Sequence, residues 1–171
     1  AYNFKLGASW NGVDFSAFFQ GIGHQDWYPA GNAISFWGPY SRPYCSFIPT
    51  QFMDEVWTET NTGAYFPRAR GYEALQTNYS LGSPSDRYLQ NIAYFRLKNL
   101  TIGYTIPVLP RFIKDLRVYF SGENLFYFSP LKKHSKYVDP EQATSSDTRY
   151  ENTGVAYNFS KTFSFGVSIT L

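Results

Sequence analysis

A group of aromatic residues in the first half of the chain is the best candidate for contact with a ligand. Its members lie close to glycine, asparagine and proline, and they are Trp27, Tyr28, Phe36, Trp37 and Tyr40. Exposed aromatic rings stack on sugar rings and on apolar side chains, so these residues could line a binding cavity. Alternatively, the same rings anchor the packing of a loop or belong to an aromatic belt at a membrane surface.

Four charged residues form a second candidate set. Arg96, Lys98, Arg117 and Glu123 fall at polar positions of segments in which apolar and polar residues alternate. Because successive side chains of a strand point to opposite faces, we expect all four on the polar face of a sheet. They could bind polar solutes or hold another domain through salt bridges. The alternative is that they are ordinary polar residues of that face.

The sequence shows no pattern of a known catalytic centre. It has no Ser/His/Asp arrangement, no glycine-rich phosphate loop and no HExxH motif, so we expect no catalytic residues and no enzyme. Cys45 is the only cysteine and His24 and His134 are isolated, so we expect no metal site and no cofactor. Asp139 and Glu141 could bind calcium together with loop carbonyls, but a proline-braced turn explains them as well.

The composition of this 171-residue chain combines many aromatic residues with a polar average. Aromatic residues make up 20% of the chain, yet the mean hydropathy is -0.35. Outer-membrane β-barrels have this combination, because lipid-facing residues alternate with polar ones and aromatic girdles lie at both interfaces. No segment approaches 18 uninterrupted apolar residues, which argues against transmembrane helices. The net charge of +2 gives no reason to expect nucleic-acid binding.

Alternation of apolar and polar residues predicts five strands and an all-β fold. Asn11-Gly12 separates two alternating runs, so residues 2–22 are expected to form a tight hairpin. Three further strands are expected at residues 89–106, 116–128 and 161–171. In the first of these three, the apolar positions change phase near Lys98-Asn99, which indicates a β-bulge.

The connections between these strands differ in length. Residues 24–87 and 129–160 form two long polar loops, the first with a short helix expected at Gln51–Trp57, whereas residues 11–12 and 107–115 are short. Long loops on one side and short turns on the other are the rule for bacterial outer-membrane barrels. Such barrels have at least eight strands. The chain is therefore expected to pair with strands that it does not contain, because open edges in lipid leave backbone groups unpaired.

Six stretches, taken in order, carry a resemblance to a known family. They are ASWNGVDFSAFFQGIGHQDWY, AYFPRA, YFRLKNLTIGYTIP, LRVYFSGENLFYFS, YVDPE and TFSFGVSITL. From about residue 2 to residue 171, the chain resembles the C-terminal end of the SusC-like (RagA-like) TonB-dependent outer-membrane transporters.

This resemblance implies a fold and a location. Residues 1–171 would be the C-terminal five antiparallel strands of a large, about 22-stranded transmembrane barrel with a plugged lumen. Residues 24–87 and 129–160 would be extracellular loops. The protein would lie in the outer membrane of a Gram-negative bacterium, in contact with its lipid. The chain opens AYNFKLGASW without a signal peptide, so we expect the true N-terminus upstream.

The resemblance also implies a function and partners. Such transporters import oligosaccharides or peptides with a SusD-like surface lipoprotein as a lid, and the TonB complex of the inner membrane supplies energy. The five loop aromatics would then contact substrate or lid, and the four charged residues would face the lumen and the plug domain. The plug domain and the TonB-contacting segment would come from upstream sequence or from another chain.

Two other functions remain open at this stage. A secreted all-β module, lectin-like, could use the loop aromatics to bind carbohydrate, and it would fold alone in buffer without detergent. A structural outer-membrane barrel without transport would share the strands but would lack a plug domain. The barrel interpretation predicts a chain that is insoluble unless the missing strands are supplied.

Overall fold

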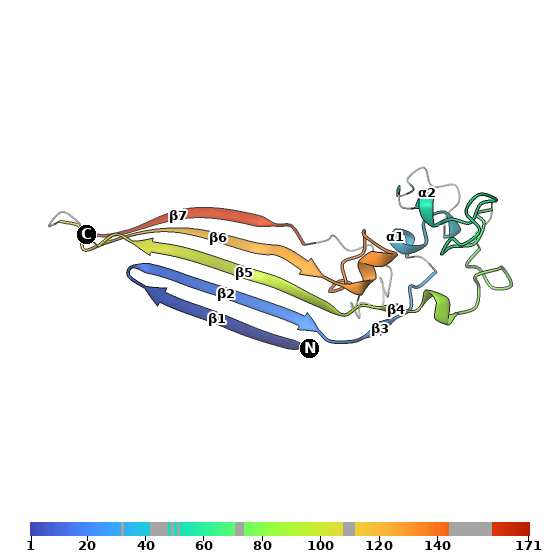
Figure 1. Ribbon diagram of the computed structural model, residues 1–171, viewed down its shortest axis with the longest axis horizontal. Coiled ribbons are helices and arrows are strands. Elements are labelled where there is room, and N and C mark those ends of the chain that lie inside the picture. Colours follow the sequence, from blue (N-terminus) through green and yellow to red (C-terminus); the bar gives the residue numbers. More distant parts are fainter. Residues whose placement is uncertain are drawn as a thin grey trace. The chain divides into compact units, whose positions relative to one another are not determined.

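The alternating runs of the sequence form one antiparallel sheet of five strands in a computed structural model of the chain. The strands are, in spatial order, β1 (Tyr2–Trp10), β2 (Val13–Ile22), β5 (Tyr94–Thr105), β6 (Asp115–Phe128) and β7 (Thr162–Thr170) (Figure 1). The structure describes residues 1–31, 33–41, 48, 50, 52–70, 74–107, 112–143 and 159–171. The predicted all-β fold with five antiparallel strands is therefore confirmed.

The chain divides into two compact units. The strand unit comprises Ala1–His24, Ala93–Ser129 and Phe159–Leu171 and holds the sheet. The loop unit comprises Gln25–Ile92 and Pro130–Asn158. Its two segments correspond closely to the long loops expected from the sequence, although residues 144–158 lie outside the described part of the chain.

The hairpin of β1 and β2 follows from its two turn residues. Asn11 and Gly12 have φ angles of 48° and 82°, and Trp10 pairs with Val13 on either side of them. Two positive φ angles in succession suit the twist of antiparallel strands, and asparagine and glycine adopt them at low cost. The predicted tight hairpin is confirmed.

Side chains of the sheet separate into an apolar face and a polar face. One cross-strand row on the apolar face reads Ala8, Phe15, Ile102, Phe120 and Phe165. In β7, the side chains of Phe163, Phe165, Val167 and Ile169 are all more than half exposed, with Phe165 at 83%. The described residues therefore leave the apolar face of this strand uncovered.

A β-bulge keeps the apolar residues of β5 on one face. The register shifts between Leu97 and Asn99 on β5 and between Phe18 and Phe19 on β2. The extra residue, Lys98, restores the facing after the phase change in the sequence. The bulge expected near Lys98-Asn99 is thus confirmed.

The two ends of the sheet carry connections of different length. β2 and β6 end, and β5 and β7 begin, at the same end of the sheet. The two segments of the loop unit leave from this end, whereas Asn11-Gly12 and the connection from β5 to β6 lie at the other. The expected segregation of long and short connections is confirmed, and the extracellular side of the long ones stays a prediction.

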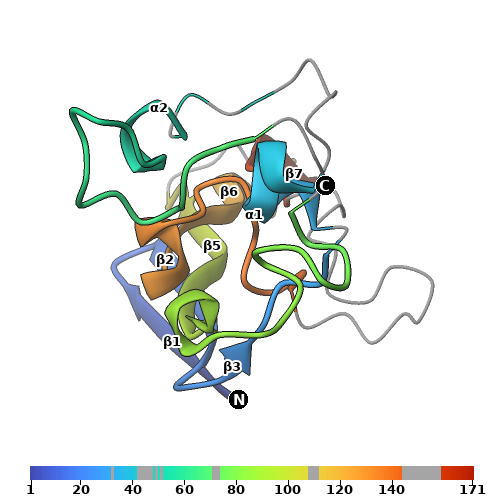
Figure 2. The same ribbon diagram turned by 90° about the vertical axis from the view of Figure 1, so that its right-hand side faces the viewer.

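The loop unit consists of short elements (Figures 1 and 2). They are β3 (Asp26–Trp27), α1 (Ile34–Trp37), η1 (Gly38–Tyr40), α2 (Phe52–Glu55), η2 (Asp86–Tyr88), β4 (Gln90–Asn91) and η3 (Pro130–Lys133). β3 pairs with β4 in a small antiparallel sheet. In the described ranges of the chain, no helix has the length and apolar character needed to cross a membrane.

Two expectations for these segments need correction. The helix expected at Gln51–Trp57 is limited to α2, because Val56 already forms a β-bridge with Phe66, and Gln51 itself lies outside the described residues. The strand expected at 89–106 is divided, since β4 pairs with β3 and β5 begins only at Tyr94. In both cases a partner distant in sequence decides the structure.

Candidate functional site

The polar face of the sheet carries an ion pair that crosses three strands. Arg117 in β6 donates a hydrogen bond from Nε to Oδ2 of Asp14 in β2 at 3.0 Å, and a second bond joins its Nη2 to Asp14 Oδ1. Gly103 of β5 lies between them, and a Cβ at this position would lie 2.1 Å from Asp14 Oδ2. Only glycine leaves room for this contact across the central strand.

Arg96 and Lys98 gather around one aromatic ring elsewhere on the strand unit. Arg96 is 1% exposed, and its guanidinium lies 4.9 Å from the ring centroid of Phe159 and 4.7 Å from that of Tyr127. Lys98 Nζ lies 4.3 Å from the Phe159 centroid. The structure thus brings together two of the four predicted charged residues, while Glu123 is exposed. That these residues face a lumen or a plug domain stays a prediction.

Most of the predicted loop aromatics pack inside the loop unit. Trp27, Phe36, Trp37 and Tyr40 belong to one buried cluster. The rings of Phe36 and Trp37 meet edge to face with centroids 4.9 Å apart, and Trp37 Nε1 donates a hydrogen bond to the Ala30 carbonyl at 3.0 Å. Tyr28 is only partly buried. Contact of this set with a substrate or lid stays a prediction, and in this structure only Tyr28 offers a partly exposed ring for it.

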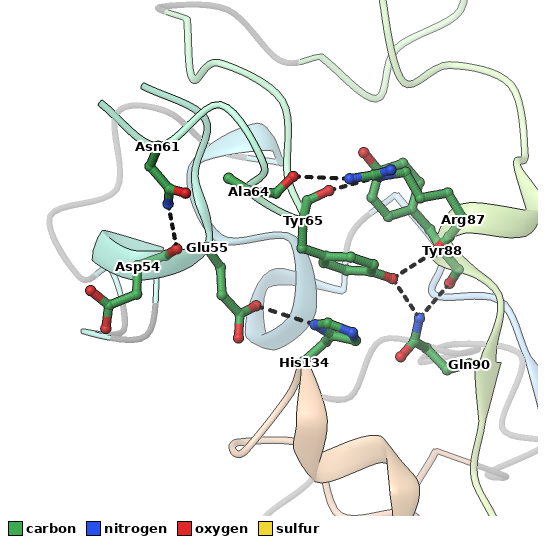
Figure 3. A network of polar contacts seen from close by, with 9 residues as sticks. All are labelled: Asp54, Glu55, Asn61, Ala64, Tyr65, Arg87, Tyr88, Gln90 and His134. Carbon is green, nitrogen blue, oxygen red and sulfur yellow. Dashed lines mark hydrogen bonds and ion pairs between the residues drawn. The ribbon is translucent and has the colours of Figure 1, made fainter. Parts of the chain in front are cut away.

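A hydrogen-bond network surrounds Tyr65 in the loop unit (Figure 3). Arg87 donates from Nε to the Tyr65 carbonyl and from Nη2 to the Ala64 carbonyl, both at 2.9 Å. The Tyr65 hydroxyl donates to the Arg87 carbonyl at 2.6 Å and accepts a bond from Gln90 Nε2 at 2.9 Å. Burial raises the pKa of Tyr65 to about 12, so the phenol stays a neutral donor at physiological pH.

His134 joins the second segment of the loop unit to the first. Its ring stacks on Tyr65 with centroids 3.7 Å apart and an interplanar angle of 10°, and its Nδ1 lies 3.7 Å from Glu55 Oε2 (Figure 3). Burial lowers the pKa of His134, with further contributions from Lys133 and Arg87. Burial raises the pKa of Glu55. Both side chains are therefore partly shielded from water, and this shielding favours the neutral form of each.

A groove of about 500 Å³ opens on the surface of the loop unit beside Trp57. Its lining comprises Val56, Trp57, Thr58, Glu59, Thr60, Arg68 and Ala69. The Arg68 guanidinium lies 4.6 Å from the Trp57 ring centroid, and Arg68 Nη2 lies 3.2 Å from Glu59 Oε1. An aromatic platform, a cation and a carboxylate thus share one open concavity.

The carboxylates of the second loop form a turn. Asp139 is buried, and its Oδ1 accepts a hydrogen bond from the Glu141 backbone N–H at 3.0 Å. The Asp139 carbonyl accepts further bonds from the backbone N–H groups of Gln142 and Ala143. The turn around Pro140 is thus confirmed. The described residues contain no group of three His, Cys, Asp or Glu side chains that could hold a metal ion.

Sequence reasoning missed the residues of the Tyr65 network and of the Trp57 groove. Tyr65 and His134 belong to different loops, so no local spacing connects them. Trp57 is followed by Thr-Glu-Thr, so a large ring with one polar N–H lies beside polar residues, and this composition is the local signal for the groove.

Comparison with known sequences gives relatives of one kind. No family model matches the sequence. TonB-dependent receptor P26 of Formosa agariphila is 25% identical over 179 residues, which covers 99% of this chain. TonB-dependent receptor P3 of the same organism is 29% identical over 129 residues, which covers 70%. The chain spans only 16% and 12% of the length of these two receptors.

Comparison with solved structures gives the same result for the fold. A structure of the RagAB peptide transporter superposes with a TM-score of 0.57 and 23% identity, covering 98% of this chain and 17% of the other. The five-stranded sheet therefore has the fold of part of such a transporter. In sequence and in fold, the chain is similar over nearly its whole length to a segment of the SusC/RagA-like TonB-dependent receptors of the outer membrane.

Proposed function

We propose that the chain forms part of the wall and the extracellular loops of a TonB-dependent importer in the outer membrane of a Gram-negative bacterium. The observation that carries the proposal is the uncovered apolar face of the sheet, on which Phe165 is 83% exposed. In the proposed setting this face meets lipid. A soluble lectin-like module would have to bury it, so the structure favours the membrane alternative.

The proposed partners follow from the edges and faces of the sheet. Among the residues that the structure describes, β1 and β7 each have a neighbour on one side only. In hydrocarbon, unpaired backbone groups cost several kcal/mol each, so further barrel strands must pair with both edges. The polar face, with Arg96, Lys98, Arg117 and Glu123, then borders the lumen and the plug domain.

The proposed cargo is an oligosaccharide or a peptide. Similarity to a peptide transporter supports the peptide alternative. The same similarity supports a SusD-like surface lipoprotein as a lid above the loop unit. Similarity to TonB-dependent receptors supports energy supply by the TonB complex, which distinguishes an importer from a purely structural barrel.

The lipid-facing assignment is tested by two neighbouring residues of β5. Ile102 lies on the apolar face and Thr101 on the polar face. Ile102→Arg in the intact receptor places a charge in lipid at a cost of about 2–4 kcal/mol near the midplane, and Thr101→Arg is the matched control. We expect less heat-modifiable, folded receptor in outer-membrane fractions for Ile102→Arg only. Equal amounts of both variants would contradict the assignment.

Transport is tested by uptake of fluorescently labelled oligosaccharides and peptides into cells. We expect uptake by cells with the receptor and TonB, and none by cells that lack either one. Uptake that does not depend on TonB, or its absence for every cargo in cells with abundant receptor, would contradict the proposed function.

A further inference from the structure

The Trp57 groove is suited in size and composition to a small part of a ligand. Its volume of about 500 Å³ lies within the range of small-molecule sites, and its lining combines one indole ring with hydroxyl and charged groups. Thr58 and Thr60 are exposed at its rim, and their hydroxyl oxygens lie 3.1 Å apart. Every lining residue belongs to the loop unit.

The frame of the groove is fixed by the buried core below it. The Trp57 backbone N–H donates to the Phe66 carbonyl at 3.0 Å, and Phe66 is buried. The turn at the rim is closed by bonds between Thr58 and Asn61 in both directions. The Asn61 side chain also donates to the Asp54 carbonyl at 2.7 Å (Figure 3). A ligand would therefore meet a preformed surface.

Arg68 is oriented by Trp57. The Arg68 guanidinium lies over the indole ring, 4.6 Å from its centroid. The Arg68 side chain is still 52% exposed. A stacked guanidinium retains its planar set of N–H donors, which matches the two oxygens of a carboxylate. The stacking thus positions a carboxylate-binding group at the surface before any ligand arrives.

Glu59 forms only a weak ion pair with the Arg68 guanidinium. A single contact of 3.2 Å joins Glu59 Oε1 to Arg68 Nη2, and the Glu59 side chain is 86% exposed. Exposed ion pairs contribute little to stability, because water and salt screen them and two long side chains must be ordered. An incoming carboxylate that can form two parallel bonds has a geometric advantage over the internal one.

We propose that the Trp57 groove binds a carboxylate-bearing ligand, whose carboxylate displaces Glu59 and pairs with Arg68 beside the indole ring. The proposal rests on the proposed function insofar as the ligand reaches the extracellular loops as cargo. Two classes of ligand carry such a carboxylate: an acidic oligosaccharide with a uronate residue, and a peptide. No bond is made or broken in this step.

The test is calorimetric titration of the intact, detergent-solubilised receptor with digalacturonate and with glycylglutamate. The neutral counterparts are digalacturonate methyl ester and glycylglutaminamide. Arg68→Gln is expected to weaken binding by about tenfold or more, because a charge-assisted bidentate pair is lost. Glu59→Gln is expected to tighten binding by about threefold, because the internal competitor is removed. Arg70→Gln, an exposed arginine outside the groove lining, is the matched control.

Each outcome decides the proposal. Binding of only the uronate or only the peptide supports the site and identifies its source, and binding of both supports it as a general carboxylate site. The proposal is overturned if neither probe binds, if the neutral counterparts bind as well, or if Arg68→Gln binds like Arg70→Gln. Heat-modifiable migration on gels verifies that each variant is folded. TonB-dependent uptake is measured separately, so a failure here leaves the importer proposal standing, and the reverse also holds.

Discussion

The strand unit and the loop unit use the same kinds of residues in opposite ways. In the strand unit, apolar side chains such as Phe165 and Trp10 stand exposed on one face of a sheet. In the loop unit, Trp37 and Phe36 are fully buried among other rings. The difference teaches that aromatic content alone does not indicate a core, because the medium in which each segment works decides where its rings belong.

The two units also differ in how they satisfy polar groups. In the sheet, backbone N–H and C=O groups of neighbouring strands bond to each other, and the ion pair between Asp14 and Arg117 passes over Gly103. The loop unit has few ladders and instead joins side chains to carbonyls, as Arg87 does with Tyr65 and Ala64. Such irregular backbone requires its own packed interior. The loop unit therefore resembles a small soluble domain inserted between membrane strands.

The largest contrast between the units is expected for Trp37→Ala and Phe165→Ala. Trp37 is fully buried, and truncation of a buried tryptophan costs about 3–5 kcal/mol. Phe165→Ala removes a ring that meets lipid in the proposed setting, and it leaves the packing inside the loop unit unchanged. Hydrogen exchange of the intact receptor should show lost protection in the loop unit for Trp37→Ala alone. Equal losses in both variants would break the comparison.

A smaller effect is expected within the sheet for Gly103→Ala. The added Cβ would lie 2.1 Å from Asp14 Oδ2 and 2.4 Å from Arg117 Nη2, so the ion pair must separate or the strand must shift. Because both atoms lie at the ends of flexible, partly exposed side chains that can move aside, we expect only a small loss of stability. Gly7→Ala in β1 is the control, because its nearest contact is 3.8 Å. Thermal unfolding in detergent should separate the two variants, and coincident curves would refute the steric argument.

Tyr65→Phe is expected to destabilise the loop unit by about 1 kcal/mol, the usual value for a lost hydrogen bond. Since folding raises the pKa of Tyr65 to about 12, its contribution is complete below pH 10 and is lost as the pH rises toward 12. Phenolate absorbance during alkaline titration should lose one late step in Tyr65→Phe. A titration curve of Tyr65→Phe that keeps this late step would be inconsistent with the network.

The smallest effect is a pH dependence at His134. Its lowered pKa means that the stacked form binds a proton less readily than the exposed form, so its contribution is complete above about pH 6.5 and is lost as the pH falls. His134→Phe keeps the stacking on Tyr65 and removes the titration. Hydrogen exchange near Tyr65 should therefore rise on acidification in the natural sequence only.

Glu55 acts in the opposite direction in this measurement. Its raised pKa gives a contribution that is complete below about pH 4.5 and is lost as the pH rises. Glu55→Gln therefore isolates the histidine effect, and the acid-induced loosening should be clearer in that background. No pH dependence in Glu55→Gln, or the same dependence in Glu55→Gln combined with His134→Phe, would argue against His134 as its source.

Much of the strand unit could be predicted because its signals are local. A period of two fixes which residues share a face, Asn11-Gly12 specifies a tight turn, and a change of phase reveals the bulge at Lys98. The predicted start of the strand at 89–106 is less accurate, because Gln90 pairs with Trp27, which lies far away in the sequence.

Little of the loop unit could be predicted, because its contacts join residues without a common period. The stacking of His134 on Tyr65 and of Arg68 on Trp57 depends on how the chain returns to itself. Composition drew attention to Trp37 as a possible ligand contact, but the same apolar surface that favours a ligand also favours burial in a core. Only the folded arrangement separates these two roles.

The ion pair above Gly103 has a mechanical consequence for the sheet. Asp14 and Arg117 sit on strands that are not neighbours, so sliding of β2 relative to β6 by two residues would move their charges about 7 Å out of reach. In a closed cylinder, the accumulated offset between strands sets the tilt and the diameter. The ion pair between Asp14 and Arg117 therefore opposes sliding of β2 relative to β6 when force is applied along the strands.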